Sequence, residues 1–203
     1  LAVEKSFPQS KMVIDRFHAV RLVMDAMQHL RVKLRWQAIE EENKAIQQAK
    51  QRGEKYYPEI FSNGDSIKEL LVRSRYLLYV FEENWTIHQM KRATILFEKY
   101  PLLQQAYKLT LSFRNIYQNI SKEKALLQFY DWKKNVITSK IEEFNTAVNS
   151  LEYHTENIFN FFDHRSTNAN AESFNSKIKG FRANLRGVTD VKFFLFRLGK
   201  LFA

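Results

Sequence analysis

The sequence predicts a mainly α-helical fold with one short strand, for three reasons. The 203 residues include only five Gly and three Pro, so few positions interrupt regular structure. Apolar side chains recur at helical spacing over most of the chain. One segment differs, because Met12, Val13 and Ile14 are consecutive apolar residues and two of them are β-branched. This run favours a short buried strand over residues 11–15.

The elements follow in order along the chain. A helix is expected to begin near Phe17 and to continue as a polar stretch to Arg52, and residues 53–66 are expected to be irregular. Asp65 or Ser66 can cap the next helix. Later helices are predicted over residues 67–78, 85–99, 101–119, 121–138, 141–162, from 168 or 170 to 187, and from 189 or 190 onward. The aromatic side chains on these helices are expected to form the core.

The composition narrows the class of protein. A net charge of +10 favours an anionic partner, most often nucleic acid, although a generally basic surface can also serve solubility alone. The absence of Cys excludes disulfides and thiolate metal sites. No apolar run approaches the ~18 residues of a membrane span, and no Gly-rich phosphate loop or nucleophile elbow is present. The first residues do not resemble a signal peptide, and without Met they are expected to lie inside a longer gene product.

The most informative run covers residues 167–179. A helix that begins at residue 168 or 170 places Glu172 in its first turn, where the helix dipole keeps a carboxylate ionised. Amide and basic residues follow it, and some share its face at spacings of three, four and seven. We interpret this helix as a surface that follows a nucleic-acid backbone, with a solvated basic helix as the alternative. The candidate DNA-binding residues are Asn175, Lys177, Lys179, Arg182 and Arg186.

A second acid, Asp15, ends the predicted strand, at the end where open sheets usually place ligand groups. We interpret Asp15 and Glu172 as catalytic residues and as ligands of one composite metal site. Mg²⁺ prefers a few carboxylates together with water and phosphate oxygens. Two such ions, ~3.5–4 Å apart, would clamp the attacking and leaving oxygens of a phosphodiester displacement. The alternative for each acid is a helix cap or an ion-pair partner, the commoner role of a lone acid.

Taken together, the two acidic motifs resemble bacterial insertion-sequence transposases of the DDE type, and in particular the ISL-three family. The resemblance rests on Asp15-Arg16-Phe17-His18 and on the run over residues 168–179. Supporting similarity occurs at residues 74–78, 100–107, 132 and 181–188, so the resemblance covers essentially the whole chain.

The resemblance implies an RNase H-like (α/β) catalytic core in which three acids hold two Mg²⁺ (or Mn²⁺) ions. A large all-α insertion separates the second acid from the third, which correspond here to Asp15 and Glu172. The core then comprises residues 1–30 and 163–203, and the insertion comprises residues 31–162. The first acid is expected on a strand before residue 1, with zinc-binding and helix-turn-helix segments further upstream.

The implied activity is Mg-dependent DNA cleavage and strand transfer during DNA transposition. The implied partner is DNA, both the ends of the element and the target. The implied assembly on DNA is a homo-oligomer, at least a dimer. The implied location is the bacterial nucleoid in the cytoplasm, and no membrane is involved. Residues 1–203 alone are expected to be inactive without the first acid. Two alternatives are a non-catalytic DNA-binding helical module or remnant, and a structural bundle that oligomerises through its long polar helix.

Overall fold

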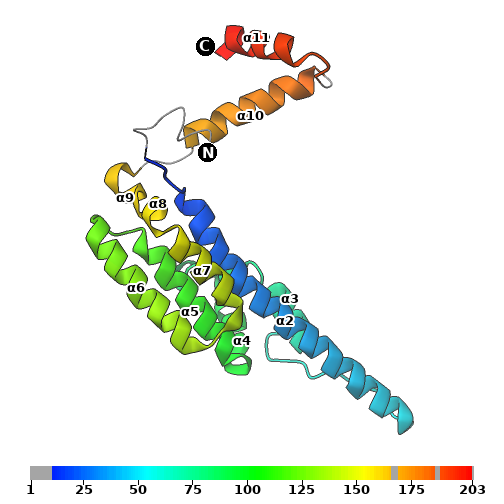
Figure 1. Cartoon of the computed structure of the whole chain (residues 1–203). Helices are drawn as coiled ribbons and strands as arrows, with labels where there is room; N and C mark the ends of the chain where they lie inside the picture. The colour runs from blue at the N-terminus through cyan, green and yellow to red at the C-terminus, as the bar shows by residue number, and fades with distance from the viewer. Residues whose placement is uncertain (1–10, 166–168, 186–187, 203) are drawn as a thin grey trace. The chain divides into compact units, whose positions relative to one another are not determined.

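A computed structural model describes residues 11–165, 169–185 and 188–202 and confirms a mainly α-helical chain (Figure 1). The chain divides into two compact units, residues 1–164 and 165–203, and each is described by itself. Over the described ranges we find no strand, only an isolated antiparallel bridge between Ile60 and Ser66.

The longest element is α2 (Arg16–Gln51), with 36 residues. One side of its N-terminal half lies in the core, where Ala19, Val23, Met27 and Leu30 are buried. Its polar C-terminal part extends past the other helices of this unit (Figure 1). The helix runs without interruption through residues 30 and 31, where the sequence places a domain boundary.

The remaining helices of the first unit pack beside the N-terminal half of α2. The central one is α5, which contacts both α2 and α6. Their bounds are α3 (Ile67–Arg73), α4 (Ile87–Lys99), α5 (Pro101–Ile116), α6 (Lys122–Ser139), α7 (Asn145–Tyr153), α8 (Thr155–Phe159) and α9 (Phe161–His164). Short 3₁₀ turns occur at η1 (Leu77–Tyr79), η2 (Glu82–Asn84) and η3 (Glu142–Phe144). The predicted aromatic core is confirmed for the buried side chains Phe113, Phe129, Trp132, Phe144, Phe159 and Phe162.

The prediction of one helix over residues 141–162 is wrong, because this range divides into η3, α7, α8 and α9. The hydroxyl of Thr155 donates to the carbonyls of Leu151 (3.0 Å) and Glu152 (2.7 Å), where α7 ends. The side chain of Asn160, between α8 and α9, is used in contacts outside its own helix.

The prediction of a strand over residues 11–15 is also wrong. These residues have no regular secondary structure, and no neighbouring strand lies in the described part of the chain to complete a ladder. Helical groups bind this backbone instead. The amide of Ile14 donates to the carbonyl of Asn157 (2.9 Å), and the Asn160 side-chain amide donates to the carbonyl of Met12 (3.0 Å). The expected burial of the apolar side chains is met in part, since Val13 and Ile14 are partly buried against the core.

The second unit contains α10 (Ala169–Asn184) and α11 (Val191–Phe202). Aromatic rings join the two helices: Phe181 stacks on Phe194 at 5.6 Å, and Phe174 meets Phe202 edge-on at 6.1 Å. Asp190 accepts a hydrogen bond from the backbone of Phe193 (3.0 Å), which confirms one of the two predicted helix starts.

Candidate catalytic and nucleic-acid-binding residues

Asp15 is the N-cap of α2. Its backbone is extended (φ −60°, ψ 135°), and its Oδ1 accepts a hydrogen bond from the amide of Phe17 at 2.7 Å. The capping role is the alternative that the sequence left open, and it places the carboxylate at the positive end of a helix dipole, which favours the ionised form. One side of α2 is buried from Ala19 onward, so this partly buried carboxylate lies at the start of a helix that is packed against the core.

A polar network fixes the segment that leads to Asp15. Asn160 is only 8% exposed; it donates to the carbonyl of Met12 and accepts from Lys122 Nζ at 3.0 Å. Asp163 pairs with Lys122 and with Lys11, each at 3.2 Å. Hydrogen bonds from Lys122 and then Lys11 hold the pKa of the Asp163 carboxyl below its usual range. The side chains around α8 and α9 therefore hold the residues before Asp15 in place.

Tyr117, at the end of α5, is a neighbour of Asp15 that the sequence did not indicate. It is 6% exposed and stacks on Phe162 at 5.9 Å, and its hydroxyl finds no hydrogen-bond partner within the described ranges. Burial, and secondly the negative charge of Asp15, raise the pKa of this hydroxyl, which therefore stays protonated. No sequence motif distinguishes Tyr117 from the many aromatic residues of the core.

The third-acid candidate, Glu172, lies in the first turn of α10, as the sequence predicts. Its side chain, and the whole of Arg186, lie outside the described structure. Asp15 and Glu172 also belong to different units, so each is described in its own surroundings.

The described basic residues of α10 are exposed but do not all share one face. Asn175, Lys179 and Arg182 are separated by four and three residues and therefore lie on the same side of the helix. Lys177 is two residues from both Asn175 and Lys179, so it points elsewhere. The described members of the predicted DNA-binding set therefore form one three-residue surface and a separate lysine, and their role in DNA binding stays a prediction.

We find no group of three acidic or His side chains able to hold a metal ion in the part of the chain that the structure describes. Asp15 contributes one carboxylate, and one of its oxygens already accepts from a backbone amide.

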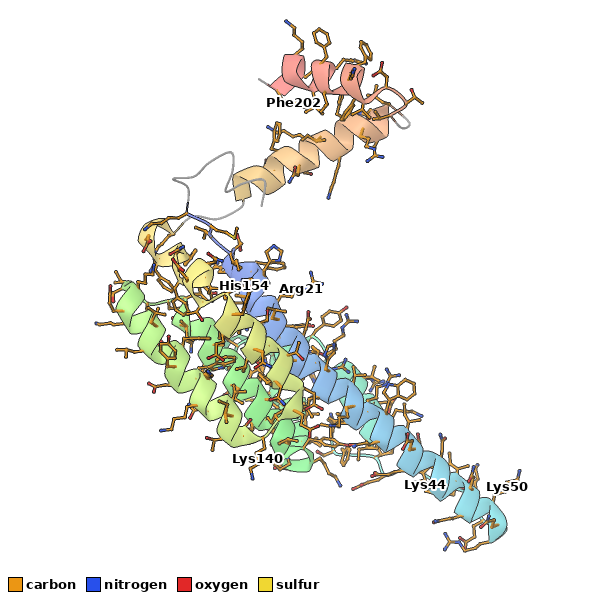
Figure 2. The ribbon with its side chains drawn as sticks, viewed as in Figure 1. Arg21, Lys44, Lys50, Lys140, His154 and Phe202 are labelled. Atoms are coloured by element: carbon orange, nitrogen blue, oxygen red, sulfur yellow. The ribbon has the colours of Figure 1, made fainter. Side chains whose placement is uncertain are left out.

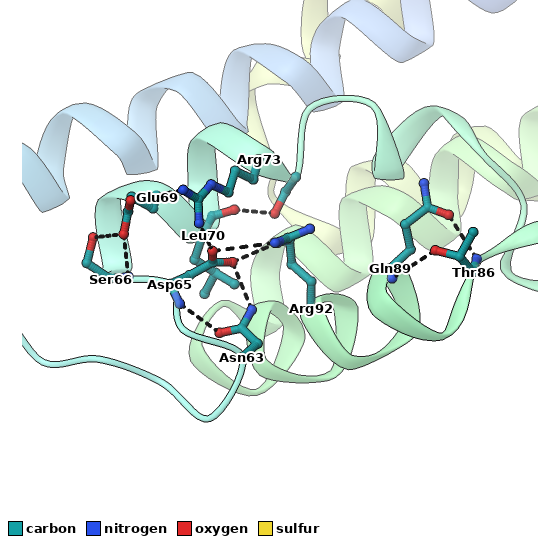
Figure 3. A network of polar contacts seen from close by, with 10 residues as sticks. Asn63, Asp65, Ser66, Glu69, Leu70, Arg73, Thr86, Gln89 and Arg92 are labelled. Carbon is teal, nitrogen blue, oxygen red and sulfur yellow. Dashed lines mark hydrogen bonds and ion pairs between the residues drawn. The ribbon is translucent and has the colours of Figure 1, made fainter.

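A second carboxylate, Asp65, is fully buried between residues of three segments (Figure 3). Arg92 Nε donates to its Oδ2 at 2.7 Å, Asn63 donates to the same oxygen at 2.8 Å, and Arg73 donates to Oδ1. Of the two predicted caps for α3, Ser66 takes that role, in a capping box with Glu69. Asp65 instead links α3 to α4, because it binds Arg73 of α3 and Arg92 of α4.

Comparison with known proteins defines the class of this chain. A family model described as a transposase matches residues 1–198, almost the full length, so the class is that of enzymes acting on DNA. The chain belongs to the ISL-three family of DDE transposases. No curated protein and no solved structure gives a significant match. None of the described helices has the length and apolar character of a membrane span.

Proposed function

We propose that this chain supplies the second and third metal-binding acids, Asp15 and Glu172, of a transposase that cleaves DNA and transfers strands. The family match over residues 1–198 carries this proposal. The local structure supports it, because Asp15 caps α2 and Glu172 lies in the first turn of α10. Both positions favour an ionised carboxylate, the form that a divalent cation requires.

In this proposal the two carboxylates hold Mg²⁺ or Mn²⁺ in the full-length protein. The ions would promote attack of water, or of a DNA 3′-hydroxyl, on a phosphodiester, with departure of the opposite 3′-oxygen. The side chains of Lys179 and Arg182 would bind backbone phosphates near that centre. The polar network of Asn160 and Asp163 would keep the segment before Asp15 fixed.

The same proposal assigns residues 1–30 and 163–203 to an RNase H-like core and residues 31–162 to a helical insertion. By the resemblance to the family, we infer that a first acid lies before residue 1. Two acids alone would bind the ions weakly, so we expect residues 1–203 to be inactive alone. We also expect the full-length protein to act on DNA as at least a dimer.

The test uses Asp15→Asn and Glu172→Gln in the full-length protein. Asn caps a helix as well as Asp does, so Asp15→Asn removes the negative charge while keeping the cap. Each variant should lower Mg-dependent strand transfer by about 100-fold or more, because losing a residue that only orients a metal ligand already costs roughly 10–100-fold. Their affinity for duplex DNA should be unchanged.

Asp25→Asn is the matched control, because Asp25 is on the same helix and is half-exposed beside Arg21. It should keep the full rate. Unchanged strand transfer in Asp15→Asn or Glu172→Gln would remove the catalytic assignment.

A second candidate is a DNA-binding helical module without catalysis. It is favoured by the exposed residues Asn175, Lys179 and Arg182, which share one face of α10. The described residues contain no comparable group of three possible metal ligands. Duplex binding that depends on Lys179 and Arg182, together with normal behaviour of the two acid variants, would select it.

A further inference from the structure

The helix α11 has two apolar sides, of which only one is used within its own unit. Phe194, Leu198 and Phe202 are spaced four residues apart and form the side that meets α10. Leu198 is 7% exposed, whereas Phe202 is 37% exposed, so this side of α11 is buried at Leu198 and partly open at its C-terminal end. Aromatic side chains also project from the side of α11 that faces away from α10 (Figure 2).

That outer side combines aromatic rings with cations. Phe193, Phe196, Arg197 and Lys200 follow each other at spacings of three, one and three, so they share one face, here called the aromatic–cationic face. Phe193 and Phe196 are 57% and 61% exposed. Lys200 Nζ lies 6.0 Å from the Phe196 ring centre. Arg197 Cζ lies 6.0 Å from the Phe193 ring centre and 5.3 Å from the ring centre of Phe181 on α10, so Arg197 lies at the edge of this face, next to the contact with α10.

The local charge limits what this face can bind. Residues 165–203 contain eight Lys or Arg and two Asp or Glu, a net charge of +6 out of +10 for the whole chain. The α11 sequence contains no acidic residue. A partner that suits the face therefore carries negative charge and also presents flat apolar surfaces.

Unpaired nucleotides have both properties. Their phosphates pair with Arg and Lys, and their exposed bases stack on aromatic rings, which is how single-stranded DNA is bound without sequence preference. A duplex keeps its bases stacked inside and offers phosphates to a side chain at its surface. The exposed rings of Phe193 and Phe196 therefore fit single strands better than duplex DNA.

We propose that the aromatic–cationic face of α11 binds unpaired nucleotides of DNA strands opened during cleavage and strand transfer. This inference rests on the proposed function only for the source of those strands. The face itself does not require Asp15, Glu172 or a metal ion.

The experiment measures binding of the 203-residue chain to a fluorescent oligothymidine of about 15 nucleotides, a length within reach of one such surface, and to a duplex of the same length. The double variant Phe193→Leu/Phe196→Leu keeps apolar bulk but removes the rings. It should weaken single-strand binding about tenfold or more, since stacking contributes roughly 1–3 kcal/mol per base. Duplex binding should change by less than about twofold, because phosphate contacts dominate it.

A second double variant, Arg197→Gln/Lys200→Gln, tests the cations. It should lower the slope of log affinity against log salt for the single strand by about 1.4, or roughly 0.7 for each phosphate that the variant no longer neutralises. Tyr153→Leu is the control, because Tyr153 is an 85% exposed aromatic residue on α7 of the first unit. It should bind single strands as the unchanged chain does.

Wild-type single-strand affinity in Phe193→Leu/Phe196→Leu would overturn the proposal. So would binding of this face to anionic vesicles in place of single-stranded DNA, or a loss of self-association in the variant with no change in DNA binding. Far-UV circular dichroism checks that both helices persist. The catalytic proposal can be rejected separately from this one. If it is wrong, Asp15→Asn transfers strands at the normal rate, and the α11 face still binds single-stranded DNA.

Discussion

At the scale of single residues, the carboxylate of Asp65 carries a full charge in a site without solvent contact. Burial raises the pKa of this group, but hydrogen bonds from Arg92 and Arg73 lower the pKa more, so the net shift is downward. Breaking a buried ion pair is costly, because removing one partner leaves the charge of the other buried without a counter-ion. Asp65 is therefore best explained as the connection between α3 and α4.

Replacing Asp65 with Asn should lower the free energy of unfolding by about 3 kcal/mol, because Arg92 then lies partly buried without its counter-ion. Chemical denaturation monitored by circular dichroism measures this loss. Glu54→Gln is the control, since Glu54 and Arg52 form a pair in which both side chains are more than 60% exposed. That change should stay within about 0.5 kcal/mol, and an equally small effect for Asp65→Asn would contradict the assignment.

The same carboxylate predicts a pH dependence. Its pKa is lower in the folded state than in the unfolded state, where an Asp titrates near 3.9. Its contribution to stability is therefore complete above about pH 4 and disappears as the pH falls through the folded-state value. The wild-type chain should lose stability more steeply below about pH 4 than Asp65→Asn, as measured by unfolding midpoints across an acid series. Parallel curves for the two proteins would contradict this linkage.

At the scale of elements, α4 begins with a reciprocal cap (Figure 3). The hydroxyl of Thr86 accepts from the amide of Gln89 (3.2 Å), and the Gln89 side chain accepts from the amide of Thr86 (2.9 Å). Thr86→Ala should destabilise the chain by about 1 kcal/mol in denaturant unfolding, because an amide of the first turn loses its partner. Thr94→Ala in the same helix removes only an exposed bond to the Met90 carbonyl and should be nearly neutral. Equal losses in the two variants would show that the cap is not responsible.

Helix starts of this kind were predictable from sequence because their signals are local. Pro101 opens α5, the Ser121 hydroxyl accepts from the amide of Lys124, and Asp190 caps α11. The interruptions after Tyr153 and Phe159 were not predictable, since no Gly or Pro marks them in the sequence.

The short segment before Asp15 illustrates the same limit. The predicted burial holds only in part, since Val13 and Ile14 are partly buried against the core and Met12 is 43% exposed. Whether the segment pairs as a strand depends on which neighbours are present, and here those are helices. The spacing of Asn175, Lys179 and Arg182 was readable directly, because helical periodicity alone determines a shared face. Tertiary packing determines which residues bind Asp65, and it brings Tyr117 within the electrostatic influence of Asp15. No sequence motif predicts either arrangement.

At the scale of the whole molecule, positive charge is unevenly divided. Residues 165–203 make up a fifth of the chain and hold +6 of its net charge of +10, whereas residues 1–164 hold only +4. Most cations of the second unit have no acidic neighbour in sequence, so phosphates are their natural partners. The second unit should therefore provide most of the salt-dependent affinity for duplex DNA.

The double variant Lys179→Gln/Arg182→Gln tests this division of charge. If each side chain neutralises one phosphate, the slope of log affinity against log salt should become shallower by about 1.8, or roughly 0.9 per phosphate. The control is Lys44→Gln/Lys134→Gln, which removes the same charge from exposed positions on α2 and α6 of the first unit. Fluorescence anisotropy with a short duplex over a range of salt concentrations measures both slopes. A control slope that falls as much as that of the α10 variant would mean that duplex binding follows net charge alone, and the α10 surface would lose its assignment.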